Sequence, residues 1–251
     1  MKVIKGVVLA ALIAAPLAGF AQDEAAGTNK LWKSNIALGA TYKNGNSEKS
    51  LFTLNLRADR FGEHHDVINT LYAEYGKTGS PTAPKEQTEG QVRAQSEYRH
   101  KFGDSKLFGG VFGEARNDAI KQIRVRAKIG PVVGYYFIDK DDMKLDATFG
   151  INYVYERTAA DGEDTYGEYR AAVNYLWNIT EKSDFYFNIE YSADVEKVDI
   201  RNSGLLVTGA RSSLYKDLAM FIELRDEYDN NPSPGTKHND ETILAGLSYA
   251  F

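Results

Sequence analysis

Apolar and polar residues alternate along nearly the whole chain. Between residues 143 and 157, for example, Leu145, Phe149 and Ile151 fall on one face, whereas Lys144 and Asp146 fall on the other. Successive side chains of a β-strand point to opposite faces, so this period of two predicts strands. Twelve stretches show it: 31–42, 49–60, 66–75, 88–102, 106–116, 124–137, 143–157, 165–179, 184–193, 198–210, 218–228 and 240–251.

The length of these stretches favours a membrane protein. Many of them run for 11 to 15 residues, whereas strands of globular sheets usually have ~5–6 residues and tilted membrane strands ~9–11. The polar faces also carry many full charges, which the core of a soluble barrel or sandwich rarely tolerates. We therefore predict an all-β fold, a single antiparallel up-and-down transmembrane β-barrel of twelve strands with its apolar face toward lipid.

Aromatic residues are sorted along the predicted strands by height. Aliphatic residues such as Ile36 and Val173 fall at mid-height. Amphipathic rings are most stable at the level of the lipid headgroups, so two aromatic girdles around an aliphatic belt are typical of such barrels. With both termini in the periplasm, the predicted girdles contain Trp32, Trp177, Tyr249 and Phe251 at the periplasmic edge, and Tyr42, Tyr153 and Tyr155 at the outer edge.

The N-terminus has the features of a secretory signal peptide. Lys2 and Lys5 precede an apolar segment at 6–14, which is too short for a stable membrane helix, and cleavage is expected after Ala21. Residues 1–21 are thus predicted to be removed, 22–30 to be a short polar leader, and 31–251 to form the barrel. The C-terminal strand ends on Phe251, through which we expect contact with the barrel-assembly machinery. Outer-membrane lipids and lipopolysaccharide are the other expected partners.

Composition excludes some classes of protein. The chain has no cysteine, so no disulfide framework stabilises it in an oxidising compartment. Its net charge is −5 at pH 7 and no block of like charge occurs, which is the opposite of a nucleic-acid-binding footprint. The longest connections are expected at 77–87 and 229–239, on the side opposite the termini, and the remaining turns are short.

Several segments resemble the YdiY-like family, whose members are called putative salt-induced outer membrane proteins. The resemblance lies in residues 38–47 (LGATYKNGNS), 112–118 (FGEARND), 129–135 (IGPVVGY) and 228–235 (YDNNPSPG), and it extends over nearly all of the mature chain. It implies an outer-membrane barrel and a link to salt or osmotic stress, and it implies no substrate and no catalytic residue.

The inward faces are predicted to carry a mixed set of charges, and these are the candidate site residues. The set consists of Arg93, Glu114, Arg116, Arg124, Arg126, Lys128, Asp146, Glu156, Glu168 and Arg170. Arg pairs with carboxylates at two points, so a salt-bridged interior that fills a smallish barrel is one interpretation. An Arg-rich wall that attracts anions through an open pore is the other. A barrel of twelve strands lies between solid and aqueous sizes, so size alone leaves both open.

The resulting functional hypothesis is a pore for small solutes or ions, linked to salt or osmotic stress. A non-conducting barrel that supports the envelope is the alternative. A lipid-modifying enzyme of the outer leaflet comes third, with His238 beside Asp240 as its only histidine on the outer side. We expect no catalytic residue and no cofactor. We also expect no metal, because the acidic segments 139–142 and 161–164 lack the ligand spacing of a calcium loop. The number of barrels that associate is left open.

Overall fold

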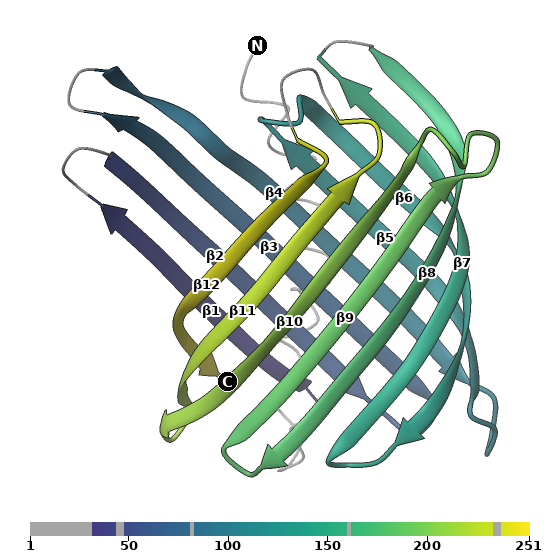
Figure 1. Ribbon diagram of the computed structural model, residues 1–251. Helices are drawn as coiled ribbons and strands as arrows, with labels where there is room; N and C mark the ends of the chain where they lie inside the picture. Colours follow the sequence, from purple (N-terminus) through teal and green to yellow (C-terminus); the bar gives the residue numbers. More distant parts are fainter. Residues whose placement is uncertain (1–31, 44–47, 81–82, 160–161, 233–236) are drawn as a thin grey trace, which may run out of the picture.

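The structure is a computed structural model, and it describes residues 32–251 apart from 44–47, 81–82, 160–161 and 233–236. Twelve antiparallel strands pair with their sequence neighbours and β1 pairs with β12, so the sheet closes into one barrel (Figure 1). The predicted fold, a single antiparallel barrel of twelve strands, is confirmed. The predicted signal peptide and leader lie outside the described residues. No helix in the described part of the chain is long and apolar enough to cross a membrane.

The strands are long, as the alternation predicted. Their bounds are β1 Trp32–Lys43, β2 Glu48–Phe61, β3 His65–Ser80, β4 Ala83–Lys101, β5 Leu107–Asp118, β6 Ile123–Asp139, β7 Met143–Thr158, β8 Glu163–Thr180, β9 Ser183–Asp194, β10 Asn202–Tyr215, β11 Leu218–Asp229 and β12 Asn239–Ala250.

The two ends of the barrel differ in their connections. Strand β1 begins and β12 ends at the same end, together with the turns 62–64, 102–106, 140–142, 181–182 and 216–217. We call this the terminal end. The opposite end, called the far end, carries the connections 119–122, 195–201 and 230–238. The long connection predicted around 229–239 is thus present.

The long connection predicted at 77–87 is wrong. Strands β3 and β4 instead continue as a polar hairpin, with Lys77 paired to Gln87 and register shifts on either side of Thr78. Backbone hydrogen bonds do not require apolar side chains, so two polar strands can pair beyond the apolar belt. The sequence pattern detects only the belt.

The tenth strand was predicted at 198–210 and lies instead at Asn202–Tyr215. The carboxylate of Asp194 accepts hydrogen bonds from the backbone N–H groups of Glu196 and Lys197, at 2.8 and 3.1 Å. Such a side chain stabilises a turn in place of a strand. Residues 195–201 therefore form a connection, and β10 begins later than the alternation suggested.

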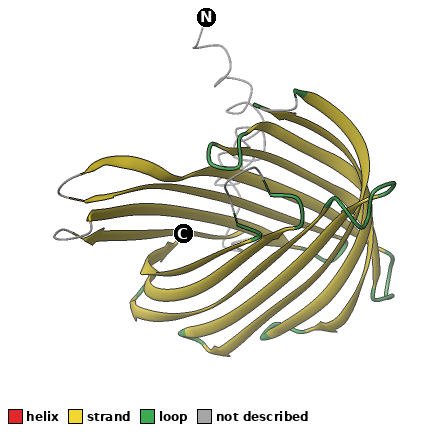
Figure 2. Ribbon diagram, turned by 45° about the horizontal axis from the view of Figure 1, so that its top comes forward, coloured by secondary structure: helices red, strands yellow, loops and turns green. Residues whose placement is uncertain are grey.

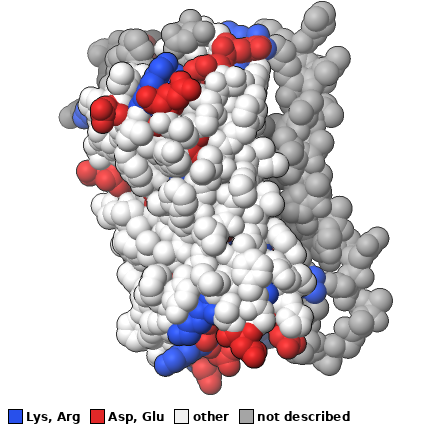
Figure 3. Space-filling view, turned by 90° about the vertical axis from the view of Figure 1, so that its right-hand side faces the viewer, with Lys and Arg blue, Asp and Glu red and all other residues white. Residues whose placement is uncertain are grey.

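The outward face is apolar at mid-height. Ile129, Val133, Ile151 and Ile189 are 60, 52, 49 and 44 % exposed, on four outward positions of β6, β7 and β9. Charged side chains gather at the two ends of the barrel, with a band nearly free of charge between them (Figure 3). This distribution is the one expected of a barrel whose belt contacts acyl chains.

The predicted girdle residues lie near the strand ends. Tyr153 (61 %), Trp177 (37 %), Tyr249 (49 %) and Phe251 (55 %) are exposed on the outside, whereas Trp32 and Tyr155 are partly buried. Tyr42 occupies a position in β1, and its side chain lies outside the described residues. Phe251 follows the last strand residue, and its backbone N–H donates to Ser34 at 3.1 Å, so the C-terminus contributes to closure.

The seam between β1 and β12 is short. Only five residue pairs join these strands, from Asn35↔Ala250 to Gly39↔Gly246, whereas β1 and β2 share twelve. Beyond the two glycines the strands diverge toward the far end (Figure 2). An apolar cluster of Ala37, Tyr72, Phe221 and Leu244 covers the interior beside the seam. The inner wall beside the seam therefore carries an apolar patch, which the alternation did not predict.

Candidate functional site

An ion-pair network crosses the lumen at mid-height, and Arg93 of β4 lies at its centre. The guanidinium group of Arg93 contacts Glu114 on β5 at 2.6 Å and Glu190 on β9 at 2.9 Å. Arg170 on β8 contacts the same Glu190 at 2.8 Å and Glu97 on β4 at 3.2 Å. Four strands separate β4 from β9 along the shorter way round the barrel. These pairs therefore join facing walls.

The network continues toward the terminal end through Arg99, whose exposed fraction is 1 %. Its guanidinium group contacts Glu97 at 2.7 Å and Asp146 at 3.0 Å, and donates to the Tyr136 hydroxyl at 3.0 Å. The same group lies over the ring of Phe108, 4.5 Å from its centroid. A buried charge is tolerated when its hydrogen-bonding groups are satisfied in this way.

Toward the far end, Arg116 on β5 joins the diametrically opposite strand. Its Nη2 lies 2.8 Å from Asp118 and 2.8 Å from Glu227 on β11. The amide of Gln91 on β4 also donates to Glu227 at 3.0 Å, and Lys121 lies 3.4 Å from it. One carboxylate on β11 thus collects donors from three positions on the opposite wall.

The wall formed by β6 to β8 carries two further pairs. Lys128 contacts Glu168 at 2.7 Å, and Arg126 contacts Glu156 at 2.6 Å and donates to the Tyr166 hydroxyl at 2.7 Å. Lys128 also lies 3.9 Å from Glu114, which connects this wall to the centre of the network. In the described part of the chain, Glu168 has no second cation within ion-pair distance.

Two cavities flank the network. A vestibule of about 1380 Å³ extends inward from the terminal end. A second cavity of about 20 Å³ lies toward the far end. Both are lined by Arg93, Glu190 and Leu205. A single layer of side chains therefore separates the vestibule from the small outer cavity.

At the far end, the connection 195–201 is fixed by charge. Arg201 contacts Asp164 at 2.9 Å and Asp194 at 3.3 Å, and it lies over the ring of Tyr166. Burial acts to lower the pKa of Arg201, but the hydrogen bond to Asp164 and the nearby negative charges outweigh it, so the pKa is raised. Arg201 keeps its charge at any physiological pH.

Nine of the ten predicted lumen residues take part in these ion pairs: Arg93, Glu114, Arg116, Arg126, Lys128, Asp146, Glu156, Glu168 and Arg170. Arg124 does not, and its side chain is exposed. The pairing of β6 with β7 shifts between Ile123 and Val125. This irregularity turns Ile123 inward and leaves Arg124 outside the network, so its predicted luminal position is wrong.

Several charged or polar residues of the lumen were absent from the predicted set. Glu227 follows Glu223 and Arg225 at a spacing of two on β11, so the alternation could have identified it. Arg211 lies just beyond the predicted tenth strand, and the error in that strand's bounds concealed it. The contact of Tyr136 with Arg99 and Asp66 joins strands that are not neighbours in the sheet, which leaves no local signal in the sequence.

His238 and Asp240 contact other residues and not each other in the described part of the chain. The Nδ1 atom of His238 lies 2.8 Å from the carbonyl oxygen of Asp229, and its ring stacks on Tyr228. Asp240 instead contacts Lys121 at 3.0 Å. No group of three His, Asp or Glu side chains among the described residues could hold a metal ion.

These features define a class, since the fold is that of outer-membrane β-barrels. The NanC porin has a TM-score of 0.51 to this chain at 8 % identity, over 86 % of this chain and 98 % of the porin. An outer membrane channel from Pseudomonas putida F1 has a TM-score of 0.49 at 9 % identity, over 91 % and 97 % of the two chains. At such identities the likeness shows the fold alone.

The sequence then places the chain in a particular family. Residues 36–251 match the family described as "Protein of unknown function, DUF481", and the chain belongs to it. This agrees with the resemblance to YdiY-like proteins. No curated protein matches the chain.

Proposed function

We propose that this protein is a narrow outer-membrane channel for small polar solutes, interrupted by ion pairs at mid-height around Arg93 and Glu190 and again nearer the far end, where Arg116 contacts Glu227. The observation that carries the proposal is the division of the lumen. A vestibule larger than the ~300–1000 Å³ of common ligand pockets is separated from the far cavity by a layer that includes Arg93, Glu190 and Leu205, which line both cavities. A purely structural barrel has no need for so large a cavity open at one end.

The charged groups of this layer can exchange partners, because several carboxylates are shared between two arginines. Glu190 is shared between Arg93 and Arg170, and Glu97 is shared between Arg99 and Arg170. When one contact breaks, each charge therefore retains a partner. This lowers the cost of a transient opening, because a buried charge without any partner is what costs most. An ion in transit would meet both signs of charge, which favours entry without tight retention.

A closed barrel that supports the envelope is the second candidate. The far cavity of about 20 Å³ favours it, because that volume accommodates about one water molecule. The two candidates differ in whether the layer ever opens.

The proposal includes location and setting. The apolar belt supports insertion in the outer membrane, with export by the predicted signal peptide and with assembly through the strand that ends at Phe251. Outer-membrane lipids and lipopolysaccharide are its proposed surroundings. We propose a non-enzymatic role, since His238 is engaged by the backbone of Asp229. A role in salt stress, which the family resemblance implies, fits a layer of ion pairs that salt weakens where water reaches it.

The test is single-channel recording in planar bilayers. The double variant Arg93→Ala/Glu190→Ala removes both members of one pair, and it leaves Glu114 with Lys128 and Arg170 with Glu97. We expect a small unitary conductance for the unmodified protein and a several-fold larger one for this variant. The matched control is Arg157→Ala/Glu163→Ala, an exposed pair at the far end with a separation of 3.5 Å, which should leave conductance unchanged. Absence of conductance in both the unmodified protein and the double variant would establish the closed barrel.

A further inference from the structure

Two arginines of the vestibule hydrogen-bond a carboxylate through Nε and have no hydrogen-bond partner on their terminal nitrogens among the described residues. Arg57 on β2 contacts a carboxylate only through Nε, with Asp59 at 2.6 Å. Arg211 on β10 does the same, with the two oxygens of Asp184 at 2.9 and 3.2 Å from its Nε. Among the described residues, no hydrogen bond joins a carboxylate to the terminal nitrogens of either guanidinium group. By contrast, Arg93, Arg99 and Arg170 each contact two carboxylates.

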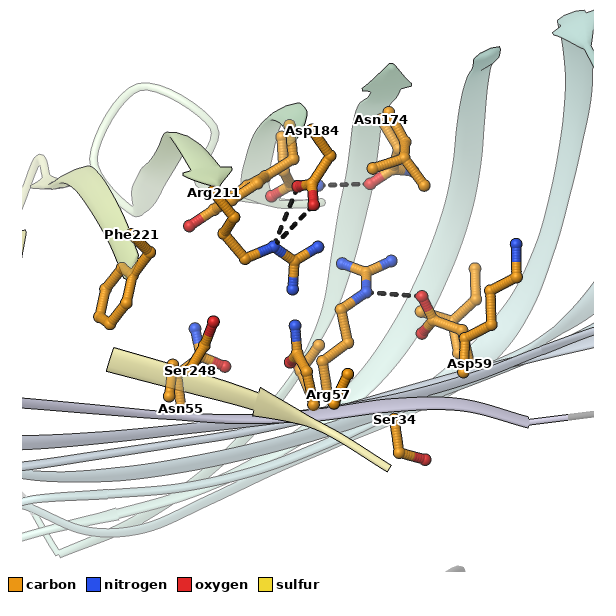
Figure 4. Close-up of a pocket in the computed structure, with 18 of the residues that line it drawn as sticks. Ser34, Asn55, Arg57, Asp59, Asn174, Asp184, Arg211, Phe221 and Ser248 are labelled. Carbon is orange, nitrogen blue, oxygen red and sulfur yellow. Dashed lines mark hydrogen bonds and ion pairs between the residues drawn. The ribbon is translucent and has the colours of Figure 1, made fainter. Parts of the chain in front are cut away.

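The free edges of both arginines point into the same part of the vestibule. Their side chains are 41 % and 23 % exposed. Figure 4 shows the two guanidinium groups directed toward the space between Asn55, Asn174 and Ser248. Arg211 is also close enough to Asp59 to interact with its charge. Two cations that face one cavity repel each other, and an anion between them relieves this repulsion.

The fixed geometry of the pair matters more than the overall charge of the vestibule. Its described lining includes ten basic and ten acidic side chains, so no general positive potential draws anions in. Asp59 and Asp184 instead hold each guanidinium group by its Nε edge, which leaves the terminal N–H groups pre-oriented. The planar fork of arginine matches a carboxylate at two points, and pre-orientation reduces the entropy lost on binding.

The remaining lining indicates what else the ligand carries. Asn55 and Ser248 offer neutral donors and acceptors, and Phe221 offers an apolar face on the seam side of the cavity (Figure 4). Amides and hydroxyls satisfy the hydroxyl groups of a polyol, and an aromatic ring packs on its C–H groups. An inorganic anion could accept hydrogen bonds from the amide and the hydroxyl, but it has no C–H groups to pack on the ring.

We propose that Arg57 and Arg211 form a binding site in the vestibule for a small organic carboxylate that also carries hydroxyl groups. This inference rests on the proposed channel, for which it names the class of solute. The site lies between the mouth at the terminal end and the layer of Arg93 and Glu190. A bound solute would therefore lie in the vestibule, next to the layer on its terminal side.

The test is isothermal titration of the folded barrel in detergent micelles with three probes: glucuronate, glucose and inorganic phosphate. Glucuronate and glucose differ by one carboxylate. We expect glucuronate to bind at least tenfold more tightly than either of the others. In the variant Arg57→Gln/Arg211→Gln its affinity should fall at least tenfold, and in Arg157→Gln, at the exposed far-end pair, it should not change.

A second variant keeps the proposal testable if the double substitution prevents folding. Asn55→Asp keeps both arginines and adds a negative charge beside them, so it should also weaken glucuronate binding at least tenfold. The proposal is overturned if glucuronate does not bind, if phosphate binds as tightly, or if the Arg57 and Arg211 substitutions leave binding intact in a folded protein. Binding is measured without conduction. Conductance without glucuronate binding would refute this site alone, and binding without conductance would refute the channel alone.

Discussion

The substitution Lys128→Met should destabilise the barrel more than Arg93→Met, although among the described residues Arg93 makes two close ion pairs and Lys128 only one. Lys128 and Glu168 are 3 and 4 % exposed in their side chains and lie 2.7 Å apart. In the described structure, removal of Lys128 leaves Glu168 buried with no cation. Breaking a buried pair in this way costs about 3–5 kcal/mol, because the remaining charge is desolvated and uncompensated.

Removal of Arg93 leaves a different situation. Glu190 keeps Arg170 at 2.8 Å, and Glu114 keeps Lys128 at 3.9 Å and the amide of Gln95 at 3.0 Å. Both carboxylates therefore retain a cation, and the expected loss is that of a charge-assisted hydrogen bond or two, about 1–3 kcal/mol.

The assay is urea unfolding in phospholipid vesicles, followed by the fluorescence of Trp32 and Trp177, the two tryptophans of the chain. The double variant Lys128→Met/Glu168→Gln serves as the control, because it removes the stranded charge and should recover at least half of the loss. If Arg93→Met costs as much as Lys128→Met, or if the double variant recovers nothing, stranded charge does not determine the stability of this network.

Three further outcomes are expected. Gly246→Ala should lower the urea midpoint of unfolding, since a Cβ there would lie 2.1 Å from the carbonyl oxygen of Leu38 at the last pair of the seam. The control Gly113→Ala should not, because its Cβ would meet only the carbonyl oxygen of Lys128 at 3.8 Å. Equal midpoints for the two variants would contradict the tight seam. The chain has no native cysteine, so engineered pairs can be tested for disulfides on non-reducing gels. Ala37→Cys/Ser248→Cys, at a paired position of the seam, should form a disulfide, and Ala40→Cys/Ala245→Cys, beyond the last pair, should not. Efficient crosslinking of both would show that the seam is fully paired and would contradict the short seam. Ile189→Arg on the outward face should cost about 2–4 kcal/mol of stability in vesicles, and Val198→Arg in the connection after β9 should cost little; equal effects would argue against a lipid-facing belt.

The sequence was sufficient for the fold because alternation and strand length are local. The twelve strands and most inward positions follow from a period of two, and a register once begun places Arg93, Glu97 and Arg99 on one face without further information. The same rule failed at Arg124, where a single irregular residue in β6 reverses the alternation. It also failed at 77–87, where polar residues form a hairpin that only backbone pairing stabilises.

The site was less accessible to sequence reasoning, because its contacts join strands far apart in the barrel. The pairs of Arg116 with Glu227 and of Arg93 with Glu190 link residues separated by 111 and 97 positions. Composition gave the charges but not their partners, so a filled interior and an open pore were equally compatible with it. The structure combines the two: a packed layer of ion pairs fills one part of the lumen, and a large vestibule occupies another. Arg57 and Arg211 differ from Arg93, Arg99 and Arg170 in their partners, because the latter three also contact carboxylates on strands that are not neighbours in the sheet, and such contacts are not visible in the sequence.

The central claim is that one layer at Arg93 and Glu190 closes a vestibule that is open from the terminal end. The most direct measurement is side-specific labelling of the single-cysteine variant Asn55→Cys in bilayers with a small charged thiol reagent. Our account predicts rapid labelling from the terminal end, much slower labelling from the far end, and a smaller difference when Arg93→Ala and Glu190→Ala are added, since the contacts of Arg116 with Glu227 remain. Equal labelling from both ends of the barrel with the layer intact, or no labelling from the terminal end, would contradict it.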